Sequence, residues 1–186
     1  MPAGNLYMNN YFTSKGYLES GIITSEHHDN ELDMRTLPPI LRVLLITDGT
    51  VTKTLEAYFW ESVLIKSIKQ ITIQLSSKHP SLISAENETV LQRNVELVGG
   101  KSNDLYAKAQ SIIRLQLLPA DIRESLIAEN MGIGELLRES GLETYRQLID
   151  IGQKDKHQIY RTYQIIIEHI PAITVTEYFP LAQYQQ

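Results

Sequence analysis

Two charged residues of this sequence fall where the alternation of side chains predicts an apolar surface. In the stretch 91–98, Arg93 shares a side with Val95, and near the end of the chain Glu177 shares a side with Val175. Charged side chains are almost never fully buried without a partner. We therefore expect both residues to face an interior, either as a structural salt bridge or as the polar groups of a site inside a cavity.

The two interpretations differ in what they imply for chemistry. A buried salt bridge adds little net stability, because desolvation offsets most of the attraction between the charges. A buried arginine that faces a cavity can instead hold a carboxylate, even in an acidic protein. The pattern leaves both open, and the second predicts a site for a small anion.

Two further cations share a side with apolar residues. Arg161 falls on the side of Tyr163 and Ile165, where it could reach the same interior or extend its head into water at the strand end. Lys69 falls on the side of Ile71, but it lies beside a possible strand break, so its face is not assigned. Arg161 is therefore the third candidate for the site.

The elements that must position these residues follow from apolar periodicity. Helical spacing begins after Pro38 and resumes after Thr50, which could cap a second helix. From Val63 the period changes to two, and a break is expected near Ser67. The expected strands cover 63–75, 91–98, 106–113, 159–167 and 172–179, and Val63, Ile65, Ile71 and Ile73 share one face of the first of them. A turn is expected at 99–104, and further helices are expected to begin near Pro119 and after Gly134. The stretch 143–151 could be helix or strand.

This order of elements predicts an α+β fold. Strands that follow one another through hairpins, with the helices grouped elsewhere, are typical of a single antiparallel β-sheet. Residues 1–35 are polar and aperiodic and are expected to form a flexible N-terminal arm, and residues 36–186 the folded domain. His27 and His28 could bind a metal, but adjacent histidines in a polar segment are more often solvated, so no metal is expected.

Composition excludes several classes of function. A net charge of −5 and a pI near 5.5 argue against a nucleic-acid surface. The absence of cysteine removes thiolate nucleophiles, iron–sulfur clusters and cysteine zinc sites. No apolar run approaches the ~20 residues of a membrane span, and the N-terminus has no signal-peptide pattern. We expect a cytoplasmic protein without a membrane or nucleic-acid partner, either a monomer or a small homo-oligomer.

Five motifs in a fixed order resemble the chorismate lyase family, in its cyanobacterial, archaeal and mycobacterial branch. The similarity extends over roughly residues 37–180, nearly all of the expected domain. The motifs are Leu45-Ile46-Thr47-Asp48-Gly49-Thr50-Val51-Thr52, Leu91-Gln92-Arg93-Asn94-Val95-Glu96-Leu97, Tyr106-Ala107-Lys108-Ala109, Gly132-Ile133-Gly134-Glu135-Leu136-Leu137 and Ile173-Thr174-Val175-Thr176-Glu177-Tyr178-Phe179-Pro180.

The resemblance implies helical flaps that enclose a ligand cavity on the sheet. It also implies a lyase that cleaves chorismate to 4-hydroxybenzoate and pyruvate without a cofactor, for quinone biosynthesis. By position, Arg93 matches the arginine that binds the ring carboxylate, and Glu177 matches the carboxylate at the ring hydroxyl, which makes these two the expected catalytic residues. Val51 and Ile133, with Gly134 beside it, match positions whose backbone N–H groups reach the ring carboxylate. Arg161 is expected at the enolpyruvyl carboxylate.

The sequence also departs from part of the family. Proteobacterial members carry Gly-Arg-Thr where this chain has Lys108-Ala109-Gln110, so no role is carried over to Lys108. The ligand-sensing domains of some bacterial transcription regulators share the fold, so a non-enzymatic sensor of a small ligand is the alternative. Such regulators carry a DNA-binding domain before the fold, whereas the preceding residues here are acidic and aperiodic. The expectation therefore favours the enzyme over the sensor and over an inactive scaffold.

Overall fold

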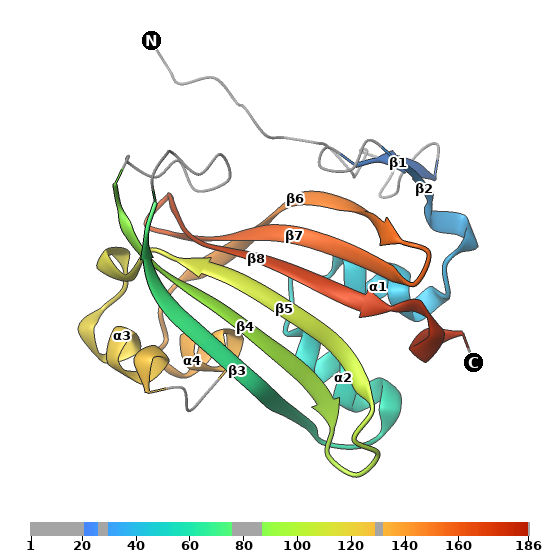
Figure 1. Cartoon of the computed structure of the whole chain (residues 1–186), viewed down its shortest axis with the longest axis horizontal. Helices are drawn as coiled ribbons and strands as arrows, with labels where there is room; N and C mark the ends of the chain where they lie inside the picture. Colours follow the sequence, from blue (N-terminus) through green and yellow to red (C-terminus); the bar gives the residue numbers. More distant parts are fainter. Residues whose placement is uncertain (1–20, 26–29, 76–86, 129–131, 186) are drawn as a thin grey trace.

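A six-stranded antiparallel sheet with helices against one face organises the molecule (Figure 1). The computed structural model describes residues 21–25, 30–75, 87–128 and 132–185. The strand order is β3-β4-β5-β8-β7-β6. The strands are β3 (Val63–Gln74), β4 (Thr89–Gly99), β5 (Leu105–Ile113), β6 (Thr144–Asp155), β7 (Gln158–Ile167) and β8 (Ile170–Pro180). The expectation of an α+β fold with one main antiparallel sheet is thus confirmed.

Four α-helices lie in the described part of the chain, and they form two pairs, one toward each end of the strands (Figure 1). One pair is α1 (Pro39–Ile46) and α2 (Val51–Phe59), and the other is α3 (Ala120–Ile127) and α4 (Ile133–Glu139). Pro39 begins α1, as its fixed φ favours, and Gly132 precedes α4. The described residues also form short 3₁₀ helices: η1 (Met34–Thr36) before α1, η2 (Leu115–Leu117) after β5 and η3 (Leu181–Tyr184) after β8.

Two apolar clusters hold these helix pairs against the sheet. Helices α1 and α2 bury Leu41, Leu44 and Leu55 completely. The second cluster places Ile122 of α3 and Leu137 of α4 against the opposite end of the sheet. Because burial of each leucine side chain contributes about 1.5–3 kcal/mol, both pairs are anchored mainly by apolar contact.

A β-bulge in β3 overturns one expectation about its faces. The break expected near Ser67 is present as a register shift between Lys66 and Lys69. Because one extra residue reverses the alternation, Val63 and Ile65 face the helices, while Ile71 turns to the other face and is 60% exposed. The prediction that Ile71 and Ile73 share a face with Val63 and Ile65 is therefore wrong.

The stretch expected as a flexible arm is partly ordered. Within 1–35, the structure describes a hairpin of β1 (Ile22–Thr24) and β2 (Glu31–Asp33), and it buries Ile23 and Leu32 in the core. For these residues the prediction of a flexible arm is wrong. Strands of three residues are too short for the alternation of side chains to reveal them in the sequence. His27 and His28 lie outside the described residues. None of the described helices is long and apolar enough to cross a membrane.

Candidate active site

A pocket of about 330 Å³ lies between the helical face of the sheet and the first turns of α2 and α4. This volume falls within the ~300–1,000 Å³ of ordinary small-molecule sites. The pocket is lined by Gly49, Thr50, Val51, Thr52, Lys53, Glu56, Val63, Leu64, Ile65, Arg93, Val95, Leu97, Ala109, Ser111, Gly132, Ile133, Gly134, Glu135, Arg138, Arg146, Tyr163, Ile165, Val175 and Glu177.

Arg93 lies on β4 and is 1% exposed, although it carries a full charge. Its cross-strand partners are Gln70 on β3 and Ser111 on β5, and the latter also lines the pocket. Since directly opposed residues in an antiparallel pair share a face, the register fixes Arg93 on the pocket side of the sheet. The facing predicted from the alternation is therefore confirmed.

Glu177 lies on β8 and is 5% exposed. Its Oε2 accepts a hydrogen bond from Nε of Arg161 at 2.7 Å, and its Oε1 accepts one from the Tyr163 hydroxyl at 3.2 Å. The cation in its ion pair is thus Arg161, from the opposed position on β7, and not Arg93 as the salt-bridge interpretation expected. Both oxygens are held by neighbours on β7, which fixes the carboxylate at the wall of the pocket.

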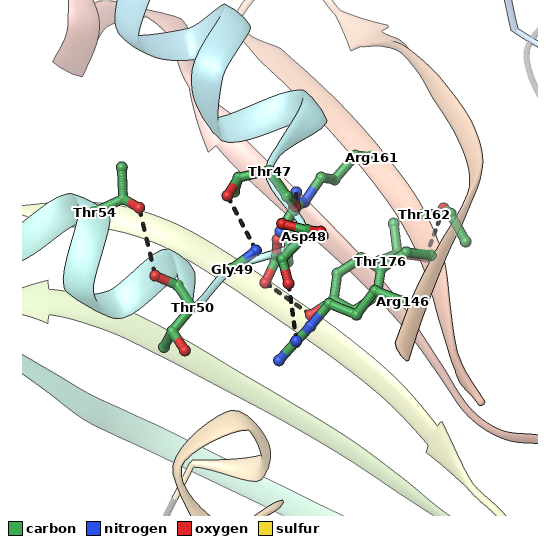
Figure 2. A network of polar contacts seen from close by, with 11 residues as sticks. Thr47, Asp48, Gly49, Thr50, Thr54, Arg146, Arg161, Thr162 and Thr176 are labelled. Carbon is green, nitrogen blue, oxygen red and sulfur yellow. Dashed lines mark hydrogen bonds and ion pairs between the residues drawn. The ribbon is translucent and has the colours of Figure 1, made fainter. Parts of the chain in front are cut away.

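Arg161 takes a different place from the one expected. It is 1% exposed, and it is not among the described residues that line the pocket. Its Nη1 donates to the backbone oxygen of Thr47 at 2.5 Å, so it joins Glu177 to the segment between α1 and α2. Figure 2 shows Arg161 reaching that segment from the sheet. Arg161 therefore holds the Glu177 carboxylate and the segment between α1 and α2 from outside the pocket.

Two helix N-termini face the pocket. Val51 is the first residue of α2 and Ile133 is the first residue of α4, and both line the pocket together with Gly134. The first N–H groups of a helix have no partner within the helix and carry a partial positive charge. The starts of both helices thus lie at the same pocket as Arg93, and the binding of a carboxylate by their N–H groups stays a prediction.

Arg146 is a pocket residue that sequence reasoning missed. It lies on β6, within the stretch that was ambiguous between helix and strand, and its Nη1 donates to the backbone oxygen of Asp48 at 2.9 Å (Figure 2). A shift of register between Leu148 and Asp150 interrupts the alternation there. Before the shift, however, Arg146 and Leu148 lie two residues apart and share one face of the strand. That short pattern would have placed Arg146 on the side of the apolar residues that face the helices.

Tyr163 was seen in the sequence only as a neighbour of Arg161. In the structure its hydroxyl contacts Glu177, and its ring lies under the Arg161 guanidinium, 4.8 Å from centroid to Cζ. Burial raises the pKa of Tyr163 well above its ordinary value, and the charge of Glu177 raises it further. Tyr163 therefore remains a protonated donor to the carboxylate over the whole neutral range.

Five of the six sequence-predicted site residues thus line one pocket: Val51, Arg93, Ile133, Gly134 and Glu177. They come from four separate elements, β4, β8, α2 and α4, which the sheet order and the two helix pairs bring together. Lys108 lies elsewhere, in an ion pair with Glu96 at 2.8 Å. A cation, two helix starts and a fixed carboxylate around one cavity can hold a small anion and move a proton next to it.

Comparison with known proteins identifies the relatives of this chain. A family model described as chorismate pyruvate-lyase Rv2949c-like matches residues 45–185. The chorismate pyruvate-lyase of Mycobacterium leprae (strain TN) is 33% identical over 167 residues, which cover 82% of this chain and 80% of that protein. The chorismate pyruvate-lyase of Mycobacterium tuberculosis (strain ATCC 25618 / H37Rv) is 28% identical over 167 residues, which cover 81% of this chain and 84% of that protein.

Among solved structures, a GntR-family transcriptional regulator superposes with a TM-score of 0.51 at 11% identity. The match covers 72% of this chain and 61% of the regulator. At this identity the likeness concerns the fold alone. The fold is shared by proteins of different families, whereas the family model and the mycobacterial relatives match this chain in sequence. They show that the chain belongs to the Rv2949c-like chorismate pyruvate-lyase family.

Proposed function

We propose that this protein cleaves chorismate to 4-hydroxybenzoate and pyruvate by an elimination that needs no cofactor. The observation that carries the proposal is that Arg93 and Glu177, both almost fully buried, line the same pocket. Chorismate is a small dianion with a ring that is one elimination away from aromaticity. The reaction is therefore downhill, and the protein has to orient the substrate, exclude water and move a proton.

Arg93 binds the ring carboxylate in this proposal. A buried guanidinium can hold a carboxylate by two parallel hydrogen bonds, which also fixes the plane of the ring. The first N–H groups of α2 and α4, at Val51 and Ile133, share the same anion. Orientation of this kind can supply about 7–11 kcal/mol of the barrier when the bound geometry is close to the reacting one.

Glu177 then acts at the ring carbon that carries the hydroxyl group. It accepts a hydrogen bond from that hydroxyl and assists removal of the proton from the same carbon. As the proton leaves, the ether carbon–oxygen bond breaks, the ring becomes aromatic, and the released enolate of pyruvate takes up a proton at its methylene carbon. Proton transfer by a positioned side chain contributes about 10²–10⁴-fold to the rate.

Arg161 and Tyr163 hold Glu177 in place for this step. The hydrogen bonds at 2.7 Å and 3.2 Å occupy one lone pair on each oxygen, and each oxygen retains a second one. Because Arg161 also binds the Thr47 carbonyl, a shift of the segment between α1 and α2 would move Arg161 and thereby the Glu177 carboxylate. The catalytic geometry is thus coupled to the wall that covers the substrate.

Purified protein incubated with chorismate tests the proposal. We expect 4-hydroxybenzoate and pyruvate in equal amounts, at a rate far above the spontaneous one, and a loss of this rate in Arg93→Ala. The matched control is Arg123→Ala, since Arg123 lies on α3 and hydrogen-bonds the Leu118 carbonyl outside the pocket. Tight binding of 4-hydroxybenzoate without turnover would instead indicate a ligand sensor.

A further inference from the structure

Each carboxylate that lines the pocket among the described residues pairs with a cation other than Arg146. Glu177 pairs with Arg161 at 2.7 Å. The remaining lining carboxylates pair within their own helices, Glu56 with Lys53 at 2.8 Å and Glu135 with Arg138 at 3.9 Å. Arg146 thus adds positive charge to the pocket beyond what the lining carboxylates of the described residues pair with.

Arg146 lies at the junction of the two helical walls. Its Nη1 donates to the Asp48 carbonyl before α2, and its Nη2 is 3.6 Å from the position that a Cβ on Gly134 would occupy at the start of α4. Its Nε is buried and has no acceptor among the described residues. The side chain therefore presents a charged donor to the pocket, while its side-chain hydrogen bond within the described part of the chain goes to a neutral carbonyl.

The two arginines stand on opposite sides of Glu177. In the sheet order β4-β5-β8-β7-β6, Arg93 comes from β4 and Arg146 from β6, with Glu177 on the strand midway between them. Four strand spacings separate their backbones, about 19 Å. Long side chains that reach inward from both sides can hold one compact ligand by its two ends, with its middle at the carboxylate.

We propose that Arg146 binds a second carboxylate of the ligand, and so distinguishes a dianionic substrate from a monoanionic product. The inference rests on the proposed lyase function: chorismate carries one carboxylate on the ring and one on the enolpyruvyl group, whereas 4-hydroxybenzoate keeps only the first. Arg93 would hold the carboxylate that both molecules share. Arg146 would hold the one that leaves with pyruvate, so cleavage removes one anchor and favours product release.

A pair of unreactive ligands separates this role from catalysis. 3-(Carboxymethoxy)benzoate is a dianion whose second carboxylate is attached through an ether to the ring position at which chorismate carries its own. 3-Methoxybenzoate is the matching monoanion. We expect calorimetry to show that the wild-type protein prefers the dianion by at least about tenfold, the effect of one charge-assisted contact. In Arg146→Gln the preference should fall below threefold, with the affinity for 3-methoxybenzoate changed less than threefold.

Two comparison variants complete the test. Arg138→Gln removes a charge from the same pocket, but that side chain is 48% exposed and paired with Glu135, so the dianion preference should stay within threefold of the wild-type value. Arg146→Lys keeps the charge and should retain part of the preference. An equal loss of affinity for both ligands in Arg146→Gln would overturn the proposal and assign Arg146 to holding the Asp48 loop. A full preference in that variant would overturn it as well.

Turnover is measured on the same samples, so that the two proposals fail separately. In Arg146→Gln, kcat/KM for chorismate should fall at least tenfold while inhibition by 4-hydroxybenzoate changes less than threefold. A wild-type protein that prefers the dianion but does not cleave chorismate would refute the lyase and leave the role of Arg146 standing. A wild-type protein that cleaves chorismate without any preference for the dianion would refute the role of Arg146 alone.

Discussion

The two helical walls of the pocket are attached to the sheet in different ways. The wall of α1 and α2 combines its buried leucines with polar contacts at both ends: Arg146 and Arg161 bind the carbonyls before α2, and Glu61 after it binds the turn between β4 and β5. The wall of α3 and α4 rests mainly on apolar side chains, such as Leu137, with a hydrogen bond from Gln70 of β3 to the Ile127 carbonyl at the end of α3. Polar contacts fix a direction, whereas apolar contacts allow sliding, so we expect the second wall to open for the ligand.

The largest effect is expected when the polar attachment is broken. Arg161→Gln removes the buried partner of Glu177 and the bond to the Thr47 carbonyl. Because an unpaired charge is then left buried, the free energy of unfolding should fall by about 3–5 kcal/mol, measured by urea denaturation. The double variant Arg161→Gln/Glu177→Gln should recover part of this loss. A loss below about 1 kcal/mol in the single variant would contradict the polar attachment.

Loss of side-chain volume under the wall of α3 and α4 should destabilise the protein. Leu137→Ala should lower the free energy of unfolding by about 2–4 kcal/mol, since Leu137 is 4% exposed and the substitution leaves a cavity. Leu137→Met keeps the volume and should cost less than about 1.5 kcal/mol. The loss in Leu137→Ala should be the same at low and high salt. A strong dependence on salt would mean that α4, too, is held by charge.

The contact between Glu61, which follows α2, and the turn between β4 and β5 should depend on pH. Hydrogen bonds from the Tyr106 hydroxyl and from the N–H groups of Lys101 and Ser102 lower the pKa of Glu61 from its usual 4.5 to about 2. Since the folded state favours the ionised form, this stabilisation is complete above about pH 4.5 and is lost as the pH falls toward 2. Urea midpoints between pH 6 and pH 2.5 should fall less steeply in Glu61→Gln. Parallel pH profiles would show that Glu61 contributes nothing.

The smallest effect concerns the approach of α4 to the sheet. A Cβ on Gly132 would lie 2.7 Å from Cδ1 of Ile65, the movable end of a side chain. Gly132→Ala should therefore lower the free energy of unfolding by only about 1 kcal/mol. Ile65→Val removes the obstructing methyl group, so the double variant should lose less than the sum of the two single variants. Simple additivity would show that α4 does not press on Ile65.

Much of the fold could be predicted because the strands alternate clearly. Alternation in β4 and β8 placed Arg93 and Glu177 on the inner face, and the turn after Gly99 was evident from its composition. Bulges caused the errors. In β3 a bulge turned Ile71 outward, and in β6 another hid the facing of Arg146.

The partner of Glu177 could not be predicted for the same reason. The turn at Glu168 and His169 pairs Ile167 with Ile170, and from that register Arg161 would face Thr176. A shift between Ile165 and Ile166 moves the pairing by one residue and sets Arg161 opposite Glu177. A sequence pattern gives the face of a residue, but a single bulge decides its neighbour.

The central claim is that Glu177 performs chemistry in the pocket where Arg93 binds the anion. Its most direct test is the turnover of Glu177→Gln at saturating chorismate, with the affinity for 4-hydroxybenzoate measured on the same sample. The account predicts that kcat falls by at least about 10²-fold while the affinity for the product changes less than tenfold, because the variant keeps the shape of the site and Arg93 is intact. Undiminished turnover in Glu177→Gln would contradict the account.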